Sequence, residues 1–399
     1  MPVPSSRKLV LALVTYATFT DIVAYAIAAP VLPDLSRKLG ASPTTIGLLF
    51  SSFGVTLLCV SIPMGTVSDR VGRRWPLVGG LIVLSAATLL FAVADGLPLL
   101  FTARLLQGAA DAITWVVGLA LLADVYEPAE RGGATGIVMS GTGFGFMIGP
   151  SLGGWLYEIG GMRLPFVTVA VMAAVGAMAF ARLDLPTRQV RDERVTVRAI
   201  VRAPAVVACA AAVVSGAATI SMLEPVVALQ LASLAIKPGR IGIVFGVAAA
   251  ASMILHPIYG RLADRWGARR LTLWGLVLTA AMLPLLGRVW SFGSAIGLYG
   301  AEAAAMALMV TPSLAYMADA TSSSGIGSFG VTYGVYNVAW GVGLLGGPAA
   351  GGFLFERMGF ARLALWWAPP LIVATLLLGR IKPARIDRPS WRSGSILRP

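Results

Sequence analysis

Apolar residues recur in long runs along nearly the whole chain, and short polar segments separate the runs. A run of about 20 apolar residues can cross a bilayer as an α-helix. The pattern therefore predicts an all-α polytopic membrane protein with twelve membrane-spanning helices. The expected spans are 9–32, 45–66, 76–94, 98–123, 133–157, 164–182, 204–232, 240–261, 271–288, 292–318, 326–355 and 361–379.

The composition points to lipid rather than water as the main solvent. Of the 399 residues, 57% are hydrophobic and 12% are charged, whereas a soluble domain carries roughly 25% charged residues. The net charge of +13 does not indicate nucleic acid, because Lys and Arg lie in short clusters between the apolar runs. The two cysteines, Cys59 and Cys209, lie inside apolar runs, which favours packing roles over a disulfide or a metal site.

The polar segments indicate orientation and domains. Most Lys and Arg residues fall on the side of the expected spans that carries both termini, so the positive-inside rule predicts cytoplasmic termini. The first apolar run is long enough to span and shows no signal-peptide cleavage site. The many Ala, Gly and Arg residues favour a bacterial inner membrane. We expect six-helix bundles at 1–182 and 204–380, a cytoplasmic linker at 183–203 and a basic cytoplasmic tail at 381–399.

The two halves repeat each other in sequence. Residues 65–74 read GTVSDRVGRR, and residues 260–269 read GRLADRWGAR. Residues 149–154 read GPSLGG, and residues 347–352 read GPAAGG. Duplicated six-helix halves are a known transporter plan, with the substrate site between the halves near mid-membrane.

These repeats, together with the run from Arg104 to Gly108 (RLLQG), resemble the major facilitator superfamily over essentially the whole chain. The resemblance implies its fold, two pseudo-symmetric bundles of six helices. Glycines mostly four apart in the fifth span leave one helix face nearly bare, which by itself favours close helix packing. This element also resembles the signature of the antiporters of the superfamily, which implies a rocking joint and export. The residues expected to form the joint are Gly145, Gly149, Pro150, Gly153 and Gly154.

Charged residues inside the expected spans are rare, and they are functional candidates because a charge is costly in the bilayer. Asp21 and Glu224 lie in the matching first and seventh spans. Two acids facing one cavity could carry protons and neutralise a cationic substrate, although either could be a hydrogen-bonded structural group. Arg104 keeps its charge and needs a partner, either Asp21 or another acid of the first half. Glu302 is a second candidate proton carrier, or a structural acid.

Three sequence runs resemble the vesicular amine transporters and their bacterial drug:proton antiporter relatives: Asp21 with residues 29–33, residues 222–225, and Tyr333 to Asn337. The resemblance implies that Asp21 contacts a substrate amine, that Glu224 belongs to the same polar network, and that Arg104 is linked to proton transfer. The aromatic residues Tyr25 and Tyr333 are expected to line the cavity and favour organic cations.

The chain departs from that family at three polar positions. The acid of the eleventh span is Asn337, and the acid expected in the tenth span is Ala307, with Glu302 nearer the outside. The basic residue of the second span is Phe53. The resemblance therefore does not establish the proton route or a monoamine substrate.

Two further ionisable residues are weaker candidates. Asp111 follows Arg104 by two helical turns, so the two broadly share a face. His256 is expected near a cytoplasmic loop, where a hydrogen-bonded histidine is ordinary.

Charges of the repeated loops are expected at cytoplasmic helix ends, where they could latch one side of the protein while the other opens. Membrane anchoring alone would place them there as well. The residues are Asp69, Arg70, Arg73, Asp124, Asp264, Arg265 and Arg269.

We therefore predict a monomeric, proton-coupled antiporter that exports small, lipophilic, cationic or amine-bearing compounds by alternating access. No cofactor is expected, because no Walker-type ATP loop occurs and the proton gradient would supply the energy. The alternative is a proton-coupled symporter that imports a small metabolite. An enzyme would need a nucleophile–base pair or a metal cluster, and the chain has one His and no clustered ligands.

Overall fold

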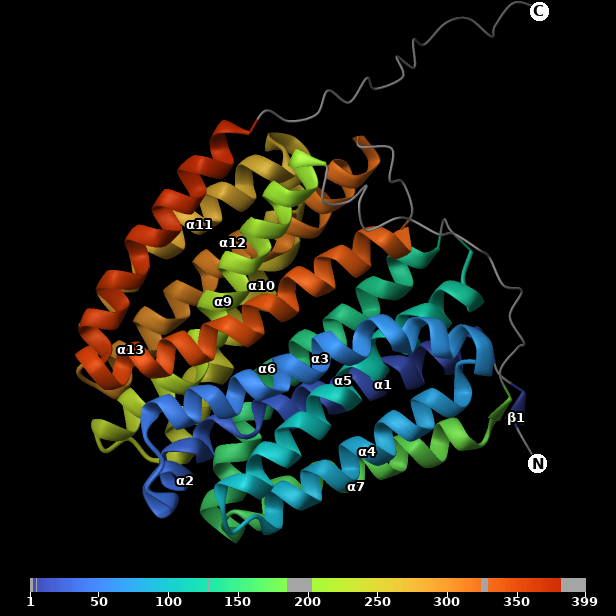
Figure 1. The fold of residues 1–399 in the computed structure, drawn as a ribbon, viewed down its shortest axis with the longest axis horizontal. Coiled ribbons are helices and arrows are strands. Elements are labelled where there is room, and N and C mark those ends of the chain that lie inside the picture. Colours follow the sequence, from blue (N-terminus) through green and yellow to red (C-terminus); the bar gives the residue numbers. More distant parts are fainter. Residues whose placement is uncertain (1–2, 5, 128–129, 185–202, 324–328, 382–399) are drawn as a thin grey trace, which may run out of the picture.

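Helices make up nearly all of the chain that the computed structural model describes, which is residues 3–4, 6–127, 130–184, 203–323 and 329–381 (Figure 1). In the first half they are α1 (Arg7–Ala26), the 3₁₀ turn η1 (Ala29–Val31), α2 (Leu32–Leu39), α3 (Pro43–Val71), α4 (Arg74–Val93), α5 (Leu97–Val125), α6 (Arg131–Gly160) and α7 (Arg163–Ala181). A two-residue strand, β1 (Val3–Pro4), pairs in parallel with β2 (Leu183–Asp184) after α7.

The second half contains α9 (Pro204–Ser233), α10 (Pro238–Trp266), α11 (Ala268–Leu286), α12 (Phe292–Ser323) and α13 (Phe329–Arg380). Gly359 interrupts α13 with a φ of 75°, a conformation that glycine adopts without steric cost. The element therefore comprises the eleventh and twelfth spans. The predicted linker, apart from its first two residues and its last, and nearly all of the predicted basic tail lie outside the described residues.

The prediction of twelve spanning helices in two bundles is confirmed. Among the described residues, ten segments are long and apolar enough to cross a membrane. The count of ten takes α13, which contains the eleventh and twelfth spans, as one segment. It also leaves out α6, because the many glycines of that helix lower its hydropathy. The expected bounds agree with the helices to within a few residues, as for 98–123 against Leu97–Val125.

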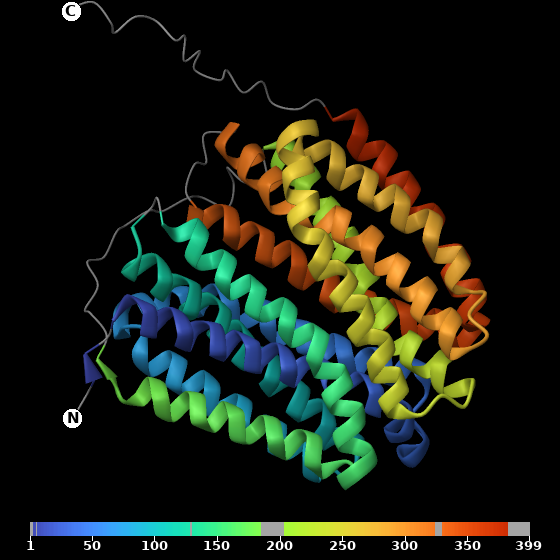
Figure 2. The same ribbon diagram turned by 180° about the vertical axis from the view of Figure 1, so that it is seen from behind.

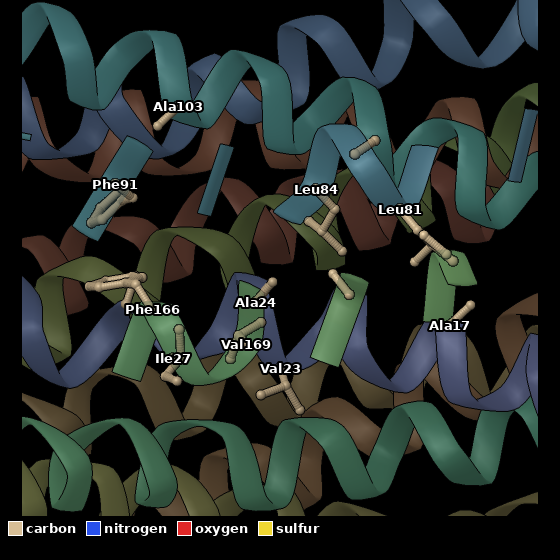
Figure 3. Packing of buried hydrophobic residues seen from close by; sticks show 14 of the residues in the cluster. Ala17, Val23, Ala24, Ile27, Leu81, Leu84, Phe91, Ala103, Phe166 and Val169 are labelled. Carbon is tan, nitrogen blue, oxygen red and sulfur yellow. The ribbon is translucent and has the colours of Figure 1, made fainter. Parts of the chain in front are cut away.

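Each bundle is held together by its own apolar core. In the first half, α4 and α7 face each other across Phe91 and Phe166, whose ring centroids lie 4.5 Å apart (Figure 3). Val169 and Leu81 extend this core toward α1, and all four side chains are fully buried. Burying apolar side chains within each bundle makes each half a packed body that can move as a unit.

Figure 2 shows the two halves side by side, the first in blue to green and the second in yellow to red. Two symmetry-related helix pairs, α6 with α10 and α3 with α13, form most of the contact between them. A Cβ atom on Gly154 would collide with the carbonyl of Pro238, and a Cβ on the matching Gly352 would collide with that of Pro43. The repeated glycines therefore let helix backbones of opposite halves touch.

The halves touch at one end of the molecule and separate toward the other. We call the end where α1 begins and α13 ends the terminal end, and the opposite end, which carries α2, the far end (Figure 1). Toward the terminal end, a Cβ on Gly132 or Gly136 of α6 would meet no atom within 4 Å. Ile254 and Ile258 of α10 are 67% and 51% exposed. The far end is closed, and the terminal end is open.

We expect Gly108→Ala to lower thermal stability, because α5 approaches α3 closely at this residue. An added Cβ would collide with the carbonyl of Phe53 and lie 2.5 Å from Oγ1 of Thr56. Overpacking of this kind costs about 1–3 kcal/mol. The apparent midpoint of thermal unfolding in detergent checks it. Gly79→Ala in α4 is the control, because its Cβ would meet no atom within 4 Å and alanine favours a helix. Equal midpoints for both variants would contradict the prediction.

Candidate functional site

Asp21 lies midway along the first span, and the structure brings Asp111 of α5 next to it. The two carboxyl groups face each other within hydrogen-bonding reach, and the side chain of Trp115 lies within reach of both. Asp21 is 2% exposed and Asp111 is 6% exposed. One oxygen of Asp21, Oδ2, has no hydrogen-bond donor among the described residues. Two carboxylates cannot bond to each other unless one carries a proton, so this pair is arranged to share one.

Glu224 lies on α9, in the other half of the protein, and reaches the first half through Tyr25 of α1. The Tyr25 hydroxyl lies within hydrogen-bonding reach of the Glu224 carboxylate. Tyr25 also packs against Phe53 of α3, at a centroid distance of 5.0 Å. Glu224 therefore lies at the junction of the two halves.

Arg104 of α5 is completely buried, and its guanidinium lies among aromatic rings. Its Cζ is 4.3 Å from the centroid of Phe50, 5.4 Å from that of Phe91 and 5.7 Å from that of Tyr25. None of its three nitrogens has a hydrogen-bond acceptor among the described residues. The acid whose charge acts on it is Glu224. The expected ion pair with Asp21 does not form, because Asp21 faces Asp111.

Glu302 of α12 is 1% exposed, and neither of its oxygens has a hydrogen-bond partner among the described residues. The nearby phenol of Tyr299 lies close enough to Glu224 and Glu302 to interact with both charges. Tyr299 therefore lies in the neighbourhood of both acids of the second half. Tyr299 was not predicted from the sequence, although it precedes Glu302 by three residues and so shares a helix face with it.

The remaining predicted cavity residues lie on α13. Asn337 is half-buried, and nearby Tyr336 exchanges a 3.0 Å hydrogen bond with Ser313 of α12. Tyr333 lies in the helix, but its side chain is outside the described part of the chain.

His256 lies on α10. Its Nδ1 is hydrogen-bonded to Oγ1 of Thr311 on α12 at 2.6 Å, so it is the hydrogen-bonded histidine that the sequence predicted.

The repeated loops differ in how their charges are used at the terminal end. Arg73 forms ion pairs with Asp69 at 2.6 Å and with Asp124 at 2.8 Å, and these contacts join α3 to α5 within the first half. The position that matches Arg73 is Ala268, so the second half has no counterpart of these ion pairs at that position. Arg269 matches Arg74: it donates to backbone carbonyls at the end of α13, including that of Gly379 at 3.0 Å, as Arg74 donates to the carbonyl of Ala181 at the end of α7. Arg70, Asp264 and Arg265 are exposed. A latching role for these residues remains a prediction.

The glycines of α6 divide between two neighbours. Gly145, Gly149 and Gly153 face α1, where an added Cβ would lie 3.1 Å from the side chains of Ile22 and Ala26 and 2.7 Å from that of Ile27. Gly154 and Pro150 face α10 in the other half. The first three therefore pack within the bundle, and the last two contribute to the closed far end.

The sequence and the fold both match known transporters. The family described as Major Facilitator Superfamily matches residues 14–227 and 207–396. The chain is 29% identical over 418 residues to the Danio rerio protein "Probable vesicular acetylcholine transporter-B", covering 98% of this chain and 83% of that protein. It is 26% identical over 377 residues to the human "MFS-type transporter SLC18B1", covering 89% and 82%.

Among solved structures, a bacterial homologue of the human lysosomal transporter Spinster, in an inward-facing and unoccupied conformation, has the same fold. The TM-score is 0.76 at 16% sequence identity, covering 93% of this chain and 95% of that chain. The predicted resemblance is confirmed. The chain belongs to the major facilitator superfamily, and it is a multi-pass membrane transporter similar to the vesicular amine transporters.

Proposed function

We propose that this transporter is a proton-coupled antiporter that exports small, lipophilic organic compounds carrying an amine or another cationic group. Its substrate and protons would bind alternately to buried acids between and within the two halves. The proton gradient would be its energy source, with no cofactor, and it would work as a monomer in a bacterial inner membrane with both termini in the cytoplasm.

The observation that carries the proposal is the buried pair of Asp21 and Asp111 with its unpartnered oxygen. A buried carboxylate is unfavourable unless a proton or a cation compensates its charge. When the pair releases its proton, a cation becomes the favourable occupant. Competition between a proton and a cationic substrate for one site is the chemical basis of antiport.

The surroundings of Glu224 support a coupling between its charge and the movement of the two halves. Glu224 belongs to the second half, while Tyr25 and the buried guanidinium belong to the first. The charge on Glu224 therefore changes the interaction between the halves. Protonation or substrate binding at Glu224 would weaken its attraction to Arg104 and favour rocking of the halves.

The relatives support a cationic substrate by their names, which refer to acetylcholine and amines. The aromatic rings around Tyr25 provide faces that attract organic cations. In the proposed cycle, substrate enters through the open terminal end and binds the deprotonated acids. The halves then rock, and protons from the outside displace the substrate.

The test is transport of a fluorescent organic cation by purified protein in proteoliposomes with an imposed pH gradient. We expect the cation to accumulate on the acidic side, and a protonophore to abolish the accumulation. A lumenal pH dye should report protons leaving the acidic side as the cation enters. Accumulation on the alkaline side would instead establish symport. No movement of several chemically different cations by folded protein would overturn the proposed substrate class.

A further inference from the structure

Two glutamates at the far end make the same contact in the two halves. The backbone amide of Gly239, at the start of α10, donates to Oε1 of Glu158 on α6 at 2.9 Å. The amide of Thr44, at the start of α3, donates to Oε2 of Glu356 on α13 at 3.0 Å. Both bonds cross from one half of the transporter to the other.

The duplication of the chain explains why the contacts match. Glu158 lies four residues after Gly154, and Glu356 lies four residues after the equivalent Gly352. Their partners follow Pro238 and Pro43, the first residues of α10 and α3. The two bonds are therefore symmetry-related copies of one contact.

Each glutamate satisfies a backbone donor that its partner helix cannot satisfy. The first amides of an α-helix have no acceptor within the helix, and its N-terminus carries a partial positive charge that favours a carboxylate. The N-cap of α10 is Lys237, whose side chain makes no capping bond. The N-cap of α3 is Ser42, which accepts from Thr45 at 3.3 Å and leaves the Thr44 amide to Glu356.

We propose that Glu158 and Glu356 are a pair of latches that hold the far end closed and set the balance between the two facing states of the transporter. The inference rests on the alternating access of the proposed function. Both carboxylates are exposed, so water can replace the helix amides when the halves part. The latches therefore open reversibly. The adjacent contacts of Gly154 with Pro238 and of Gly352 with Pro43 align the helices that the latches join.

The test measures conformation directly and needs no substrate. Spin labels would be placed on cysteines at exposed Arg163 and Trp290, on opposite halves at the far end, with exposed Cys59 replaced by serine. A second pair at Gly132 and Arg261 reports on the terminal end. Distance distributions from these labels give the populations of the two states.

In the double variant Glu158→Ala/Glu356→Ala, we expect the population with an open far end to rise about tenfold, because each hydrogen bond of an exposed carboxylate should favour the closed state by a factor of about three. The terminal-end distance should shorten in the same molecules. Glutamine at both positions should restore much of the wild-type distribution, because its amide oxygen can still accept the bonds. Asp95→Asn is the control, since Asp95 is an exposed far-end acid with no bond across the halves among the described residues.

Wild-type distances in the folded double alanine variant would overturn the latch. An equal change in Asp95→Asn would also overturn it, because surface charge would then explain the shift. A shift confined to the double variant in a protein that moves no cation would support the latch and count only against the proposed substrate. Cation antiport by the wild type, with unchanged distances in the double variant, would support the proposed function and overturn the latch.

Discussion

Asp21→Asn is expected to abolish proton-driven accumulation of organic cations while leaving the protein folded. Asparagine has nearly the same shape and can hydrogen-bond to Asp111, but it can neither take up a proton nor balance a cation. Loss of a required charge should reduce transport by at least about tenfold, equivalent to about 1.4 kcal/mol. The measurement is cation accumulation in proteoliposomes under a fixed pH gradient, at equal amounts of reconstituted protein.

Asp111→Asn is the matched control, because it makes the same change on the other member of the pair. It leaves a titratable acid at Asp21 and supplies an amide that can bond to it. We expect a smaller loss of gradient-driven transport than in Asp21→Asn, because the unpartnered carboxylate oxygen of the pair belongs to Asp21. If Asp21→Asn transports normally, the proton carrier lies elsewhere, at Glu224 or Glu302. Equal loss in both variants would show that the two acids act as one unit.

Arg104→Met should make the protein more stable and inactive. All three guanidinium nitrogens are buried without a hydrogen-bond acceptor among the described residues, and an unsatisfied buried group costs about 1–3 kcal/mol. Methionine fills a similar volume among the rings of Phe50, Phe91 and Tyr25 without that cost. Transport should fall at least about tenfold, because the charge opposite Glu224 is lost. Thermal unfolding in detergent and the proteoliposome assay measure the two effects.

Arg73→Met is the control for this prediction, since it removes another buried arginine whose charge is paired. Arg73 bonds to Asp69, Asp124 and Ser68. Breaking such contacts should lower stability by about 2–3 kcal/mol, a value reduced because Asp69 is partly exposed. Opposite shifts of the unfolding midpoint in the two variants are expected. Destabilisation by Arg104→Met would mean that the buried guanidinium holds the fold together.

The architecture could be predicted from the sequence because the bilayer imposes simple rules on it. A span must be apolar for about 20 residues, and each backbone group must bond within its own helix. These rules are local, so the positions of the helices could be deduced without knowledge of their neighbours. The repeats around Asp69 and Asp264, and around Gly149 and Gly347, indicated two related halves by comparison of the chain with itself.

The candidate site could be predicted only in part. The rarity of charge in the spans identified Asp21, Glu224, Arg104 and Glu302 as candidates, because the depth of a residue along its own span can be deduced from the sequence. Which of them meet depends on the rotation and separation of helices far apart in the chain. The expected pairing of Arg104 with Asp21 was wrong for this reason.

The sequence alone thus determined that this is a twelve-helix, duplicated membrane protein with a few acids in its spans, because hydropathy and repetition are properties of the chain itself. Only the tertiary structure decided that Asp21 faces Asp111, that aromatic rings surround Arg104, and that Glu158 and Glu356 cap helices of the opposite half. Each of these contacts joins different helices, and no local pattern specifies how two helices face each other.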